Sequence, residues 1–71
     1  MTRIKRESRF NNDKLRELRK ERGMSQANFA LAIDVNWRTI YLWERGEVVP
    51  GYDLAVAIAD FFDVSLDEFR R

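Results

Sequence analysis

The sequence predicts an all-α domain built from five short helices. Two observations carry this prediction: four helix starts share one residue pattern, and glycine or proline separates several of the expected helices. No segment alternates apolar and polar residues with the period of two that a half-buried strand requires. The chain has 71 residues and no cysteine, so packed helices must supply its stability without disulfides.

Four of the five expected helix starts pair a capping residue with two apolar residues. The cap side chain accepts from a free backbone N–H, while the apolar residue before it packs against one in the first turns of the helix. The four sets are Phe10-Asn11 with Leu15, Met24-Ser25 with Phe29, Val35-Asn36 with Ile40, and Val64-Ser65 with Phe69.

Helix ends follow from the same kind of punctuation. Gly23 and Gly46 each follow a basic residue, as expected where a cation meets the negative end of a helix and glycine ends it. Pro50-Gly51 introduces a further helix, whose apolar stripe is either Leu54, Ile58 and Phe62 or Ala55, Ile58 and Phe62. The predicted helices span residues 12–22, 26–33, 37–45, 52–62 and 66–70.

Composition argues against catalysis and against a membrane location. The chain has neither histidine nor cysteine, which removes the commonest general base and the usual metal ligands. Its glycines form no phosphate-binding loop, and no apolar run approaches the roughly 18 residues of a membrane span. The charged N-terminus is unlike a signal peptide. We therefore expect a cytoplasmic, non-enzymatic protein without a cofactor, a metal or a small-molecule ligand.

The net charge of +1 hides a gradient along the chain. Residues 1–23 hold nine basic and four acidic residues, whereas residues 46–71 hold two basic and six acidic ones. Such a gradient orients a protein on a polyanion. The same charges also fit exposed helix faces that do no more than interact with water, so charge alone leaves both interpretations open.

The second and third predicted helices form a closely packed pair. Only residues 34–36 join them, which forces a steep crossing and requires a small residue where the backbones meet. Ala30 occupies that position. The side chains expected to point from this pair into the core are Phe29, Ile33, Val35, Ile40 and Trp43. This pattern is typical of a helix-turn-helix unit.

The pattern also resembles a known family over nearly the whole chain, from about residue 11 to residue 69. The matching positions are the run Leu15–Gln26, then Phe29-Ala30, Ile33, Val35-Asn36, Thr39-Ile40, Trp43–Gly46, Pro50 and Val64–Glu68. They resemble the lambda-repressor/Cro-type (Xre-like) helix-turn-helix family. The resemblance implies a compact five-helix DNA-binding domain over residues 11–71, and a homodimer that regulates transcription. Residues 1–10 would then be a mobile basic arm.

On this interpretation the third helix enters the major groove of double-stranded DNA. By helical geometry its outer face holds Trp37, Arg38, Tyr41, Leu42 and Arg45. Arg38 can bridge guanine O6 and N7, while the apolar side chains suit thymine methyl groups. An exposed face this apolar also fits a protein partner. The alternative function is therefore an antitoxin-like or accessory subunit that binds protein through Trp37, Tyr41 and Leu42.

Further DNA contacts follow from the resemblance for Gln26 and from position on the third helix for Thr39 and Arg45. A glutamine in the position of Gln26 contacts phosphate and braces the recognition helix in the family, although Gln26 is also an ordinary exposed helix former. Thr39 lies on the side of the third helix that faces phosphate, and its hydroxyl can donate either to a phosphate or to the backbone of its own helix. Arg45 lies near the next phosphate, and Asn36 completes the predicted set. Departures from the family pattern are the acidic Glu47 and the replacement of two glycines by Asp34 and Asp63, where we expect positive φ and local strain.

The resemblance also implies a structural ion pair and a dimer. Arg19 and Glu44 match an ion pair between the first and third helices. Two copies on an inverted repeat would place their third helices about 34 Å apart. The expected dimer surface is the acidic end, with Phe61, Leu66 and Phe69. The basic arm, which carries Arg3, Lys5, Arg6 and Arg9, either enters a minor groove or serves as a solubilising tail.

Overall fold

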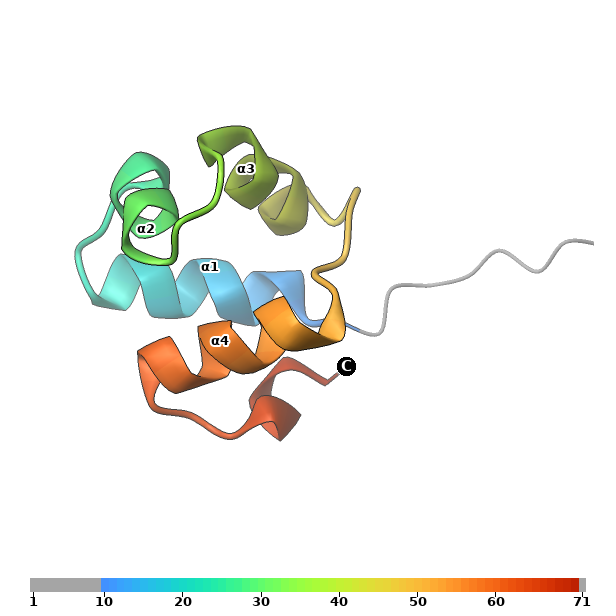
Figure 1. Ribbon diagram of the computed structural model, residues 1–71. Helices are drawn as coiled ribbons and strands as arrows, with labels where there is room; N and C mark the ends of the chain where they lie inside the picture. The colour runs from blue at the N-terminus through green and yellow to red at the C-terminus, as the bar shows by residue number, and fades with distance from the viewer. Residues whose placement is uncertain (1–9, 71) are drawn as a thin grey trace, which may run out of the picture.

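The computed structural model describes residues 10–70 and has an all-α architecture over that range, as predicted. Four α-helices precede a short 3-10 helix: α1 (Asn12–Glu21), α2 (Gln26–Ala32), α3 (Trp37–Arg45), α4 (Tyr52–Phe62) and η1 (Leu66–Phe69). Figure 1 shows α2 and α3 on one side of α1, with α4 and then η1 on the other. Within the described range, no helix is long and apolar enough to cross a membrane.

The fifth predicted helix is wrong in type. The segment is a single 3-10 turn of four residues in place of an α-helix over residues 66–70. Arg70 already has extended backbone angles (φ −84°, ψ 135°) and forms an antiparallel bridge with Phe10. Because the chain is already extended at Arg70, only four residues remain for this helix. Helical segments of that length are commonly 3-10 turns. The first two helices end one residue earlier than predicted, at Glu21 and Ala32.

All four predicted caps are confirmed. The side chains of Asn11, Ser25, Asn36 and Ser65 each accept a hydrogen bond from a backbone N–H in the first turn of the helix they precede. The donors are Lys14, Asn28, Arg38 and Asp67, at 2.8–3.1 Å. Each bond satisfies a donor that has no partner inside its own helix, so the chain itself marks where each helix begins.

The core lies between α1, the α2–α3 pair and α4. Its most deeply buried apolar side chains, at most 2% exposed, are Leu15, Phe29, Ile40, Trp43, Ile58 and Phe69. Ile33 and Val35 pack against this cluster, as predicted. In α4 the buried stripe is Ala55, Ile58 and Phe62, whereas Leu54 is 36% exposed. The structure thus selects one of the two stripes that the sequence allowed.

Two of the three side chains predicted to form the dimer surface pack against the core of the domain. Phe69 is only 2% exposed, because its ring stacks on that of Phe10 with centroids 5.2 Å apart. Phe61 is half-buried, with its ring 5.6 Å from Phe29 and the Arg22 guanidinium 5.5 Å above its centroid. The prediction for Phe69 is wrong, because tertiary contacts bury it, whereas Phe61 stays partly accessible.

Phe10 packs within the folded domain, although the predicted arm of residues 1–10 includes it. It is 7% exposed, and the backbone N–H of the following Asn11 donates to the Phe69 carbonyl at 2.6 Å. The arm residues Arg3, Lys5, Arg6 and Arg9 lie outside the described residues. The bridge, the ring stack and this hydrogen bond together fasten the start of the described chain to its end.

Asp34 and Asp63 take left-handed backbone angles, as expected from the glycines they replace. Their φ values are 60° and 57°. Asp63 ends α4 as its C-cap, and Asp34 lies in the turn between α2 and α3. A side chain at positive φ carries a local cost that glycine avoids. The turn between α2 and α3 and the turn after α4 therefore each carry this local conformational cost.

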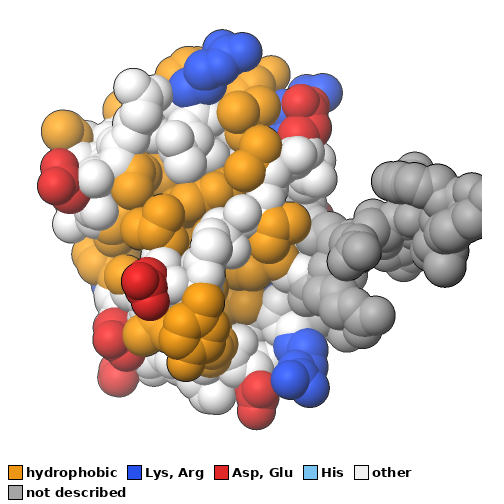
Figure 2. All heavy atoms as spheres, turned by 45° about the vertical axis from the view of Figure 1, so that its right-hand side comes forward, with side chains coloured by type: hydrophobic (Ala, Val, Ile, Leu, Met, Phe, Trp, Pro, Cys, Tyr) orange, Lys and Arg blue, Asp and Glu red, His pale blue; other side chains and the backbone are white. Residues whose placement is uncertain are grey.

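One side of the molecule exposes apolar side chains around the start of α4. Val49, Tyr52 and Leu66 are 49%, 73% and 36% exposed; we call these three residues the α4 patch. Val49 and Leu66 line a shallow hollow of about 510 Å³ together with Ala55, Asp67 and Arg70. Tyr52 lies one helical turn before Ala55, on the same side of α4. Figure 2 brings this side forward and shows hydrophobic side chains gathered across it.

Candidate nucleic-acid interface

The turn between α2 and α3 holds the two helices in the predicted arrangement. The backbone N–H of Val35 donates to the Ala30 carbonyl at 2.9 Å, and Asp34 supplies the left-handed residue that this reversal needs. Ala30 is 3% exposed, as expected where two helices approach closely. The helix-turn-helix geometry therefore rests on a small residue, a positive φ and one backbone hydrogen bond.

A buried carboxylate fixes α3 to the rest of the domain. Glu44 is 1% exposed, and its two oxygens accept from Arg19 Nε at 2.6 Å and Arg19 Nη2 at 2.9 Å. Gln26 Nε2 donates to Oε1 of the same carboxylate at 3.0 Å. A paired arginine fork with an added amide donor satisfies a charge that would otherwise be costly to bury. The ion pair implied by the resemblance is confirmed, and so is the bracing role of Gln26.

Two side chains of α1 also bind the backbone of the last turn of α3. The Glu44 carbonyl accepts from Asn12 Nδ2 at 3.1 Å and from Arg16 Nη2 at 2.7 Å. Neither of these α1 residues is among those predicted from the sequence. Their spacing was the available signal, because Asn12, Arg16 and Arg19 repeat at four and three residues and so share one face of α1. One face of α1 thus sets the orientation of α3.

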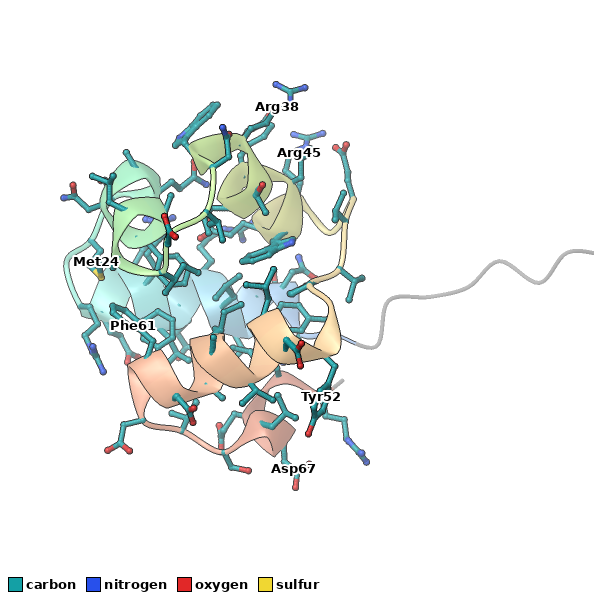
Figure 3. All side chains as sticks on the ribbon, in the orientation of Figure 1. Met24, Arg38, Arg45, Tyr52, Phe61 and Asp67 are labelled. Carbon is teal, nitrogen blue, oxygen red and sulfur yellow. The ribbon has the colours of Figure 1, made fainter. Side chains whose placement is uncertain are left out.

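The outer face of α3 points away from α4 and carries two arginines. Figure 3 shows Arg38 and Arg45 directed to the same side of the molecule, whereas Tyr52 and Asp67 lie at the opposite end. Trp37 is 48% exposed and stacks on Tyr41, with ring centroids 5.6 Å apart and planes 17° apart. The apolar part of this face is smaller than predicted, because Tyr41 and Leu42 are half-buried.

Arg45 is engaged with its neighbours. Its Nε donates to Glu47 Oε2 at 2.5 Å, and its guanidinium lies 5.5 Å above the Tyr41 ring centroid. The hydrogen bond to Glu47 raises the pKa of Arg45 above its ordinary value, with a further contribution from Tyr41. Glu47, which the sequence marked as an unfavourable acid near phosphate, thus has a partner within the domain.

The other predicted contact residues lie along the helix pair, from the cap of α3 to the side of its last turn. Asn36 is exposed, and its side-chain oxygen accepts from the Arg38 backbone N–H at 2.8 Å. Thr39 is half-buried. Gln26 is half-buried beside Glu44, and its amide nitrogen has a second N–H beyond the one it gives to Glu44. All eight predicted residues therefore lie on α3, at its cap or at the start of α2. Within residues 10–70, no cluster of three or more possible metal ligands occurs.

Comparison with known proteins agrees with this geometry. The helix-turn-helix family profile matches residues 15–69. A protein of Thermococcus kodakarensis, provisionally named an HTH-type transcriptional regulatory protein, is 35% identical over 60 residues, which are 84% of this chain. The matched segment spans only 19% of that relative. Because the family match covers most of the chain and includes both helices of the pair, this protein belongs to the helix-turn-helix DNA-binding family of the Xre and lambda-repressor type.

Proposed function

We propose that the protein binds double-stranded DNA sequence-specifically and regulates transcription, with α3 in the major groove. The observation that carries the proposal is the outer face of α3, where Arg38 and Arg45 project to one side from a helix held by Glu44 at its base. Rigid placement matters because base readout requires hydrogen-bond geometry that a loosely held helix cannot keep. The name of the Thermococcus relative supports a role in transcription.

The proposed contacts divide into base readout and positioning. Arg38, in the first turn of α3, bridges guanine O6 and N7, and Trp37 and Leu42 pack against thymine methyl groups. Gln26, Asn36, Thr39 and Tyr41 contribute phosphate or groove-edge contacts that set the register. We propose repression as the regulatory mode, because a protein that occupies an operator blocks access without further contacts. Its place would then be the cytoplasm, on the nucleoid.

Salt dependence of binding tests this proposal. With about six to ten phosphate contacts per dimer, affinity for a selected duplex is expected to fall roughly 10³- to 10⁵-fold between about 50 and 200 mM salt. Fluorescence anisotropy with a duplex recovered by selection from random DNA measures this. A scrambled duplex is the matched control and must bind more weakly at every salt concentration. Absence of duplex binding even at low salt would reject the proposal.

A protein-binding role for α3 is the second candidate. It is favoured by the 48% exposure of Trp37 and the 80% exposure of Leu31 on neighbouring α2. An apolar protein interface changes little with salt, so the same titration separates the two functions. A partner that binds with salt-independent affinity, together with no retention on DNA, would favour this candidate.

We further propose a homodimer on an inverted repeat, joined through the α4 patch. The patch lies away from the outer face of α3, so both recognition helices stay free for DNA. Asp67 and Arg70 border the hollow beside Val49 and Leu66. A two-fold axis would place Asp67 of one copy near Arg70 of the other copy. Of the three residues that the sequence predicts at the dimer surface, this proposal retains Leu66. It replaces Phe61 and Phe69 by Val49 and Tyr52.

Tyr52→Ser is expected to weaken the dimer without unfolding the domain, because 73% of Tyr52 is already exposed. Sedimentation velocity without DNA should show a shift toward the monomer. Leu31→Ser is the matched control, since Leu31 is a similarly exposed apolar residue (80%) outside the patch. Equal sedimentation of the two variants would argue against the α4 patch as the dimer surface.

A further inference from the structure

Glu47 and Tyr41 both contact the Arg45 side chain, which is 54% exposed. Glu47 accepts from Nε alone, and the Tyr41 ring lies beneath the guanidinium plane. Arginine has five N–H donors, four of them on its two terminal amino groups. The ion pair with Glu47 therefore uses the inner donor and leaves the outer edge of the guanidinium directed outward. That outer edge is the part that matches a pair of acceptors on one base.

Arg45 stands in register with Arg38 along α3. The two are seven residues apart, which is close to two helical turns, so both project to the same side, as Figure 3 shows. The rise between them is about 10.5 Å. Base pairs stack about 3.4 Å apart. For a helix lying along the groove, the two arginines therefore face base pairs about three steps apart.

We propose that Arg45 reads a guanine, with Glu47 as its positioning residue, so that each half-site carries two guanine contacts about three base-pair steps apart. This inference rests on the proposed function and deepens it. It replaces the expectation that Arg45 contacts phosphate. A guanine contact differs from a phosphate contact in what it requires of Arg45. A phosphate needs only a nearby positive charge, whereas two acceptors on one base need a guanidinium of fixed orientation.

The acid at position 47 is the physical reason for preferring base over phosphate. An arginine beside a carboxylate has little net charge to offer a phosphate, and the carboxylate itself repels the DNA backbone. The same carboxylate restricts the rotation of a long side chain, which lowers the entropy cost of placing it against one base. An acid at this position thus opposes nonspecific binding and favours specific binding.

Substitution of 7-deazaguanine for guanine in the selected duplex tests the inference. The modified base lacks the N7 acceptor. Wild-type affinity is expected to fall at two positions per half-site, about three base pairs apart. Removing a bidentate contact corresponds to about 5- to 150-fold in discrimination, so a loss of measurable size is expected at each. Arg38→Ala should abolish sensitivity at one position only, and Arg45→Ala at the other only.

Two substitutions of Glu47 separate positioning from charge. Glu47→Gln keeps an oxygen that accepts from Arg45 Nε, so it should keep the guanine preference and bind all duplexes more tightly. Glu47→Ala removes both the charge and the acceptor, so it should also bind all duplexes more tightly but lose sensitivity at the Arg45 position. Thermal unfolding of each variant checks that the domain remains folded.

The outcomes separate this inference from the proposed function. Wild-type protein that binds no duplex overturns both. Selective duplex binding in which Arg45→Ala weakens all sequences equally, and lowers the salt slope by about one contact, overturns only the guanine contact and supports a phosphate contact. Identical guanine sensitivity of Glu47→Gln and Glu47→Ala overturns the positioning role of Glu47.

Discussion

Replacement of Glu44 by alanine is expected to lower the free energy of unfolding by about 3–5 kcal/mol. The substitution leaves Arg19, which is 8% exposed, as an uncompensated charge within the domain. It also removes the acceptor of the Gln26 amide. A domain of this length has a total stability of roughly 4–11 kcal/mol, so a large part of it depends on one carboxylate. Urea denaturation followed by tryptophan fluorescence measures the change.

Glu68→Ala is the control for this experiment. Glu68 forms an ion pair with Lys14 at 3.4 Å, and its side chain is 48% exposed, so solvent screens the pair and its removal should cost little. Replacement of both Arg19 and Glu44 by apolar residues of similar size should recover much of the loss, since no buried charge then remains unpaired. A loss for Glu44→Ala no larger than that for Glu68→Ala would contradict the assigned role of Glu44.

Replacement of Phe29 by alanine is expected to cost about 3–5 kcal/mol. Phe29 is fully buried, and its ring contacts those of Phe61 and Phe62 at centroid distances of 5.6 and 5.2 Å. The cavity would lie where α2 meets α4, at the base of the helix pair. Circular dichroism during thermal unfolding should show a large decrease in Tm, with weaker DNA binding wherever the folded fraction falls.

Phe61→Ala separates a core role from a dimer role for the neighbouring ring. Phe61 is half-buried, so its removal should reduce stability by less than the Phe29 substitution and leave the proposed dimer unchanged. If Phe61→Ala instead dissociated the dimer at unchanged stability, the surface expected from sequence would be correct and the packing against Phe29 unimportant.

Local signals in the sequence predicted most of the fold. Caps such as Asn11 and Ser25 act through hydrogen bonds within one turn, so their effect is readable without tertiary structure. The left-handed angles of Asp34 and Asp63 were expected from the family resemblance, because both residues replace glycines of its pattern. Burial of Phe61 and Phe69 was not readable, because it depends on rings that come from distant segments.

For the candidate site, the sequence predicted which residues lie on the outer face of α3 but not which side-chain contacts they make. Arg38 and Trp37 face outward as helical periodicity requires. The contacts of Arg45 with Glu47 and Tyr41 depend on side-chain rotamers at a helix end, which periodicity does not specify. Sequence therefore marked Glu47 only as a departure from a family pattern, and the structure supplies a partner for it.

The stack of Phe10 on Phe69 has a consequence for how this domain can be combined with others. Because the two ends of the described chain meet there, polypeptide attached at either end would leave from one place, beside α4 and η1 and away from the outer face of α3 (Figure 1). Domains with adjacent ends tolerate insertion into longer chains. Further segments can therefore be joined at either end of the described chain without covering the outer face of α3.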